Sequence, residues 1–188
     1  MFHRFKKQDK ESLSKKEITK KLVNLAVFLA LGVIFNIVEN YIVFIPALPG
    51  VKLGLANSIG LILLALYGPL EFFGIGLLRV LLSGTFSGFG SSFLLSLSGF
   101  LISSAFVLLA YLFNKLSLYG YSLISAVTHG LGQVIVIAWM YENDLMLNYA
   151  GIMILSGIIT GLLVASVAKV VILRLRMFKI ESSNYEIN

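Results

Sequence analysis

Arg79 lies inside an almost wholly apolar stretch, Leu70–Ser83. A guanidinium group keeps its charge in proteins, and placing it at the centre of a membrane costs about 2.5–3.5 kcal/mol on insertion scales. A chain that carries such a residue is expected to use it. Other polar side chains interrupt the neighbouring apolar stretches in the same way: Asn36, Glu39, Lys52, Asn57, Ser83, His129 and Gln133. Together these residues predict a polar pocket inside a membrane protein.

The composition supports a membrane protein. Of the 188 residues, 58% are hydrophobic and 13% are charged, whereas a soluble domain carries about 25% charged residues. Eight of the 15 Lys and Arg residues lie in 4–21 and four lie in 169–179. Basic ends that flank apolar spans are typical of cytoplasmic membrane borders, so the high pI of about 9.6 does not indicate nucleic-acid binding. The absence of cysteine excludes disulfides, thiol catalysis and Cys-bound metals.

The apolar runs predict an all-α integral membrane protein with six transmembrane helices. A membrane-spanning helix needs roughly 17–25 residues, and the second and third runs are short, so a re-entrant pair buried in protein is an alternative for them. A cytoplasmic basic segment, 1–20, would precede a six-helix domain, 21–174, and a cytoplasmic tail, 175–188. The even count places both basic termini inside. The predicted spans are Lys21–Val38, Val51–Tyr67, Pro69–Ser83, Phe93–Phe113, Tyr119–Met140 and Tyr149–Leu173.

In this topology the polar side chains share one depth. Each would lie in or near the outer half of the membrane, although they come from four separate spans. Unrelated structural residues would be scattered over both halves, so the shared depth favours a ligand pocket. Four alternatives stay open: Arg79 as an ion-pair partner of Glu39, His129 as an interhelical hydrogen-bond donor, Gln133 and Asn57 as helix–helix contacts, and Lys52 as a side chain reaching the headgroups.

Two further features predict contacts at the edges of the bundle. Ala26 and Ala30 form a small-residue stripe that would let another helix approach closely, either a partner or a helix of the same bundle. The segments Ile45–Gly50 and Gly84–Ser92 read as outer loops, one stiffened by prolines and one rich in glycine, that would act as a lid.

Enzyme chemistry has little support in the sequence. The only aspartates are Asp9 and Asp144, so a Mg²⁺–diphosphate site has no ligand cluster, and two histidines do not make a zinc site. Ser91 with His129 would be the pair of a membrane serine protease, but Gly90-Ser91-Ser92 lacks the Gly-x-Ser-Gly setting. No phosphate-binding loop is present. We therefore expect no enzyme, no metal and no cofactor.

Three strings resemble a known bacterial membrane family, the Gx transporter family, whose older label is heptaprenyl diphosphate synthase component I. They are Pro49-Gly-Val-Lys-Leu-Gly-Leu-Ala-Asn57, Gly76-Leu-Leu-Arg-Val-Leu-Leu-Ser-Gly84 and Thr128-His-Gly-Leu-Gly-Gln133. The likeness spans roughly Leu22 to Leu175. Members of that family usually carry Asn after the histidine, where this chain has Gly130, which would remove one ligand hydrogen bond or alter substrate preference.

The family is similar to the substrate-binding S components of energy-coupling factor (ECF) transporters. The resemblance implies six helices, an outward-facing pocket for a vitamin-like molecule, and docking through Ala26 and Ala30 on a membrane coupling subunit driven by two ATPases. It also implies the bacterial cytoplasmic membrane, with contact to lipid and none to nucleic acid. We thus expect Arg79 to bind an anionic or zwitterionic small molecule, helped by Glu39, Lys52, Asn57, Ser83, His129 and Gln133. The alternative is a non-transporting assembly or structural subunit.

Overall fold

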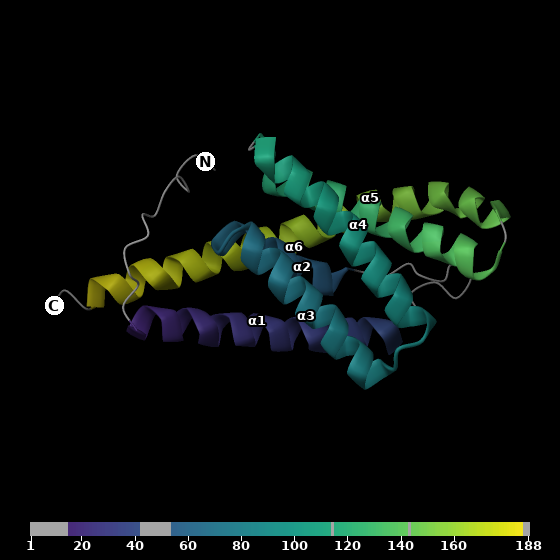
Figure 1. The fold of residues 1–188 in the computed structure, drawn as a ribbon. Helices are drawn as coiled ribbons and strands as arrows, with labels where there is room; N and C mark the ends of the chain where they lie inside the picture. Colours follow the sequence, from purple (N-terminus) through teal and green to yellow (C-terminus); the bar gives the residue numbers. More distant parts are fainter. Residues whose placement is uncertain (1–14, 42–53, 114, 143, 186–188) are drawn as a thin grey trace.

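The computed structural model describes residues 15–41, 54–113, 115–142 and 144–185, and these ranges are almost entirely helical (Figure 1). Each α-helix overlaps one of the six predicted spans, and α3 begins at Pro69, where its span was predicted to begin. Their bounds are α1 Lys15–Tyr41, α2 Leu55–Leu66, α3 Pro69–Ser87, α4 Ser91–Phe113, α5 Leu118–Met140, the 3-10 helix η2 Asp144–Tyr149, and α6 Ala150–Tyr185.

Helix α2 differs from the prediction because it is too short to cross a membrane. Its 12 residues extend about 18 Å at 1.5 Å per residue, against a hydrocarbon core of roughly 30 Å. The other five α-helices are long and apolar enough to cross. The predicted sixth crossing is therefore not confirmed. The placement of both termini on one side depended on an even count, and it stays a prediction.

Glycines in left-handed or related conformations limit α2 at both ends. Gly54 precedes the helix with φ of 78°, and Gly68 follows it with φ of 111° before Pro69 starts α3. These positive φ values are readily accessible only to glycine, and proline is well suited to the first turn of a helix. The chain therefore makes a tight turn at Tyr67-Gly68-Pro69 between α2 and α3.

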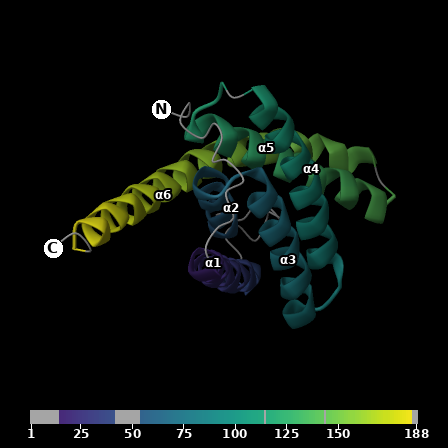
Figure 2. The same ribbon diagram turned by 60° about the vertical axis from the view of Figure 1, so that its left-hand side comes forward.

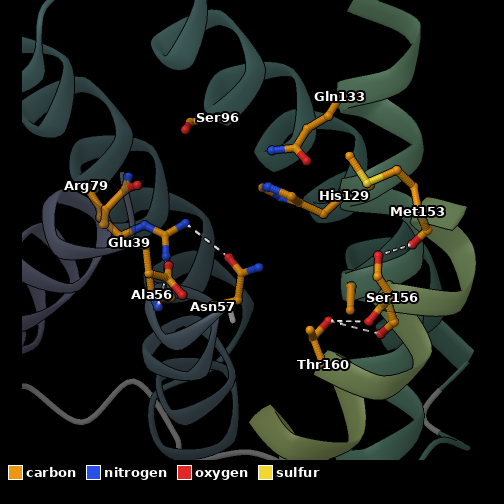
Figure 3. A pocket seen from close by; sticks show the side chains of 15 residues that line it. Glu39, Ala56, Asn57, Arg79, Ser96, His129, Gln133, Met153, Ser156 and Thr160 are labelled. Atoms are coloured by element: carbon orange, nitrogen blue, oxygen red, sulfur yellow. Dashed lines mark hydrogen bonds between the residues drawn. The ribbon is translucent and has the colours of Figure 1, made fainter. Parts of the chain in front are cut away.

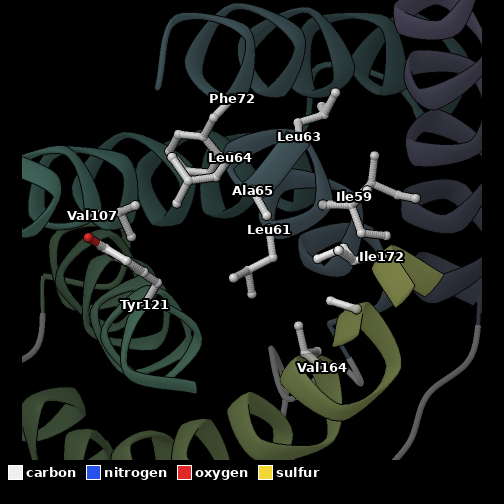
Figure 4. Close-up of a cluster of buried hydrophobic side chains, with 12 residues drawn as sticks. Ile59, Leu61, Leu63, Leu64, Ala65, Phe72, Val107, Tyr121, Val164 and Ile172 are labelled. Carbon is white, nitrogen blue, oxygen red and sulfur yellow. The ribbon is translucent and has the colours of Figure 1, made fainter. Parts of the chain in front are cut away.

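Helix α2 is the centre of the bundle. It packs against α1, α3, α5 and α6, and eight of its residues are buried, among them Ile62 and Leu63, which are 2% and 1% exposed. Figure 4 shows its side chains meeting Phe72 of α3, Val107 of α4, Tyr121 of α5 and Val164 of α6. A short helix at membrane depth must be surrounded by protein, and α2 meets that condition.

The outer helices complete the bundle. Helix α4 packs along α5, α5 along α6, and α1 against α3; near one end, Lys21 of α1 and Glu71 of α3 form an ion pair of 2.5 Å. Helix α6 continues beyond the predicted end at Leu173 and projects past the bundle (Figures 1 and 2). No Gly or Pro follows until the helix ends at Tyr185, so nothing in the sequence interrupts it.

Two predicted features outside the spans have different outcomes. The glycine-rich loop predicted at Gly84–Ser92 is wrong in extent, because α3 runs to Ser87 and α4 begins at Ser91, leaving only Gly88–Gly90 between them. Gly88, with φ of 85°, ends α3, whereas Gly84 is accommodated within the helix. The loop predicted at Ile45–Gly50, together with Lys52, lies outside the described residues.

Candidate functional site

The first wall of the site forms where α1 meets the start of α2. Gly54 has no side chain to cap the free N–H groups of α2. The carboxylate of Glu39 takes that role from α1: it accepts hydrogen bonds from the backbone N–H of Leu55 at 2.6 Å and of Ala56 at 3.4 Å. A negative charge at a helix N-terminus is stabilised by the helix dipole. Glu39 is therefore buried (6% exposed) with its charge engaged by backbone.

Arg79 reaches the same turn of α2 from α3. Its Nη1 donates to the carbonyl of Ala56, and its Nη2 lies 3.5 Å from Oδ1 of Asn57, at the long limit of a hydrogen bond. The side chain passes over Gly32 of α1, where an added Cβ would lie 3.0 Å from Cδ of Arg79. Arg79 is 6% exposed, and its Nε has no hydrogen-bond partner within the described part of the chain.

The second wall faces Arg79 and comes from α5 and α6. Figure 3 shows His129 and Gln133 of α5 pointing into the space opposite Arg79 and Asn57, with Ser156 and Thr160 of α6 below them. The imidazole of His129 lies against α4 at Gly99, where an added Cβ would approach its ring atoms to 2.7 Å. The ring of His129 therefore fits in this position only because Gly99 has no side chain.

Between the two walls lies a cavity to which all six α-helices contribute. Its empty space of about 610 Å³ includes space that is open to the surroundings. Its lining combines one guanidinium, one carboxylate, one imidazole, amides and hydroxyls. The residues are Asn36, Glu39, Gly54, Ala56, Asn57, Arg79, Ser96, Ala126, His129, Gly130, Gln133, Met153, Ser156, Gly157 and Thr160.

The structure thus brings five of the predicted ligand-binding residues to one cavity: Glu39, Asn57, Arg79, His129 and Gln133. Gly130 also lines it.

The remaining predicted residues lie elsewhere. Ser83 is buried beside a smaller cavity that shares Asn36 and Ser96 with the main one, and its hydroxyl donates to the carbonyl of Arg79 at 2.8 Å. Lys52 lies outside the described residues. Ala26 and Ala30 are on the exposed face of α1, so the alternative that they pack inside this bundle does not hold within the described structure.

Sequence reasoning missed the contribution of α6. Ser156 and Thr160 line the cavity, and their hydroxyls donate to the carbonyls of Met153 at 3.0 Å and of Ser156 at 2.9 Å. A hydroxyl that donates to a carbonyl of its own helix costs little free energy in an apolar stretch. Such a residue is therefore a weaker sequence signal for a functional site than Arg79 is. Their i, i+4 spacing was the available signal.

The polar groups that line the cavity can hydrogen-bond to a small ligand. In the ranges that the structure covers, no group of three or more His, Asp or Glu side chains could hold a metal ion. The buried guanidinium of Arg79 lies opposite an imidazole and an amide, and its Nε has no acceptor in the described part of the chain. Such a group is suited to an anionic group such as a carboxylate or phosphate.

These features define a multi-pass helical membrane protein with a polar cavity at its centre. The model of one family, heptaprenyl diphosphate synthase component I, matches residues 28–171. The chain belongs to this family. Searches among curated proteins and among solved structures gave no match.

Proposed function

We propose that this chain is the substrate-binding membrane subunit, or S component, of an ECF-type importer, and that it captures a small anionic molecule in the cavity beside Arg79. The observation that carries the proposal is that cavity, to which every α-helix contributes and in which a buried cation faces neutral hydrogen-bonding groups. A purely structural polar residue would be satisfied by its neighbours, whereas the buried Nε of Arg79 has no acceptor among the residues that the structure describes.

The charges around the cavity favour an anion over a zwitterion. Glu39 could have accepted a ligand amine, but its two carboxylate oxygens already accept the N–H groups of Leu55 and Ala56. The partial positive charge of the α2 N-terminus offsets the negative charge of Glu39. Glu39 also attracts Arg79, but its two oxygens accept backbone N–H groups, so the guanidinium keeps hydrogen-bonding capacity for an anionic group of the ligand.

The proposed coupling to other subunits uses the exposed face of α1. Ala26 and Ala30 lie on that face between exposed Leu22, Val23 and Val27. Small residues at such a face let a second helix approach closely in a membrane. We assign this face to a membrane coupling subunit, which would link ATP hydrolysis by two ATPases to movement of this chain.

A second function is suggested by the family description, which names a component of heptaprenyl diphosphate synthase. In that case the chain would be an assembly subunit of a soluble prenyltransferase, and the polar residues would fix the helices in place. The described residues hold no acidic cluster for a Mg²⁺–diphosphate group, so the catalytic residues would have to belong to the partner.

One purification experiment separates the two functions. The tagged chain is extracted from its own membranes in mild detergent, and the co-purifying proteins and small molecules are identified by mass spectrometry. The transporter proposal predicts a coupling subunit, two ATPases and a bound anionic small molecule. A soluble prenyltransferase as the stable partner, with no small molecule, would establish the assembly function instead.

A variant of Gln133 makes the test specific to the cavity. Gln133→Ala removes a side chain of the cavity without touching the hydrogen bonds between Arg79 and α2, so it should lose the small molecule while retaining thermal stability. Thr19→Ala is the matched control, because Thr19 is exposed on α1, far along that helix from Asn36 and Glu39. Retention of the small molecule by Gln133→Ala would contradict the proposed site.

A further inference from the structure

A second, apolar cavity adjoins the polar one, and the two share Arg79 and Asn57 as lining residues. The second cavity has about 390 Å³ of empty space, part of it open. Aromatic and aliphatic side chains dominate its lining, in contrast with the amides and hydroxyls of the first. Its other residues are Phe28, Ile59, Gly60, Leu63, Phe72, Ile75, Gly76, Phe100, Ser103 and Ser125.

The apolar cavity lies consistently to one side of the polar one. On α1 it is lined by Phe28, eight residues before Asn36 of the polar cavity, a difference of about 12 Å along the helix. On α4, Ser103 lies beyond Ser96, and on α5, Ser125 precedes His129. Arg79 and Asn57 therefore stand at the boundary between a polar compartment and an apolar one.

Two glycines and an aromatic wall shape the apolar compartment. An added Cβ at Gly60 would lie 3.2 Å from the ring of Phe72, and one at Gly76 would clash with the ring of Phe100. The rings of Phe72 and Phe100 are 6.5 Å apart between centroids. Any side chain at Gly60 or Gly76 would therefore press on the rings that line this space.

We propose that the ligand is an amphiphilic anion, whose negative group lies at Arg79 and whose compact aromatic or hydrocarbon portion enters the apolar cavity beside Phe72 and Phe100. This inference rests on the proposed function, since it assigns the substrate class of the same site. The long contact of 3.5 Å between Arg79 Nη2 and Asn57 Oδ1 is weak, so a ligand displaces it at little cost. An anion without an apolar portion would leave the second cavity unused.

Matched pairs of small anions test the inference on the purified chain in nanodiscs. Inorganic phosphate is compared with phenyl phosphate, and acetate with phenylacetate, by titration calorimetry against protein-free nanodiscs. The anion with the ring should bind roughly tenfold more tightly or better, because burying a ring removes apolar surface from water. Equal affinities within both pairs would overturn the inference and leave the proposed function standing. Failure of all four anions to bind would overturn both.

Variants that fill the apolar cavity test whether the ring of the ligand binds there. Ser103 is buried (3% exposed) and lines this cavity. In Ser103→Leu, the anion with the ring should therefore bind less than about threefold more tightly than the anion without it. Ala105→Leu, on the exposed face of the same helix, is the control and should keep the full advantage. Gly60→Ala serves as a second filling variant if Ser103→Leu does not fold. An undiminished advantage in a folded filling variant would contradict the placement of the ring.

Discussion

Replacing Glu39 by alanine should destabilise the protein, because the carboxylate is the cap of α2. The side chain is 6% exposed and accepts from the backbone N–H of Leu55 at 2.6 Å and of Ala56 at 3.4 Å. Gly54, at the cap position, has no side chain to replace it. Since α2 contacts four of the other α-helices, loosening its first turn should be felt throughout the bundle.

The size of the effect follows from the two contacts. A buried N–H that loses its acceptor costs about 1–3 kcal/mol, and only the contact to Leu55 is short. The loss of the charge at the N-terminus of α2 adds roughly 0.3–2 kcal/mol. Glu39→Ala should thus cost about 2–4 kcal/mol, whereas Glu39→Gln, which keeps an acceptor oxygen but no charge, should cost about 1 kcal/mol.

The assay is thermal unfolding in detergent, followed by circular dichroism and by loss of monodisperse protein. Glu142→Gln is the control, since Glu142 is exposed and its change should stay within about 0.5 kcal/mol. The expected order of stability is wild type and Glu142→Gln, then Glu39→Gln, then Glu39→Ala. Unfolding of Glu39→Ala at the wild-type temperature would refute the cap.

Two glycine substitutions test how the cavity side chains are seated. Gly32→Ala places a Cβ 3.0 Å from Cδ of Arg79 and should cost about 1–3 kcal/mol of stability through overpacking. The control Gly74→Ala meets nothing within 4 Å and should be neutral or gain up to about 1 kcal/mol from helix propensity. Equal melting temperatures of the two variants would contradict the close approach at Gly32. Gly99→Ala should displace the ring of His129, because the added Cβ would lie 2.7 Å from ring atoms. Titration calorimetry with phenyl phosphate should then show weaker binding to this variant. Unchanged affinity would mean that the ring of His129 takes no part in binding the ligand.

The sequence identified the polar residues whose burial is expensive. Arg79, Asn57, His129 and Gln133 interrupt apolar runs, and all four line one cavity. The cost of a charge or amide in an apolar span is a property of the residue and its neighbours in sequence, so it can be recognised without a structure.

What escaped the sequence depends on contacts between distant segments. The part of Glu39 as a cap required the position of Leu55 and Ala56 in space, and the burial of α2 required the packing of four other helices. The hydroxyls of Ser156 and Thr160 bond to their own helix, so hydropathy does not distinguish a cavity-lining hydroxyl from one that faces lipid.

Thiol accessibility tests most directly whether a polar cavity opens to the outside. The chain has no cysteine, so single variants report one position each. Ser156→Cys lines the cavity, and Ser104→Cys is the control, because Ser104 is 1% exposed and lines none of the three cavities described. A membrane-impermeant thiol reagent added to intact cells should label Ser156→Cys and not Ser104→Cys. If Ser156→Cys stays as unreactive as Ser104→Cys, in intact and in opened cells, the cavity is closed to water and the account is wrong.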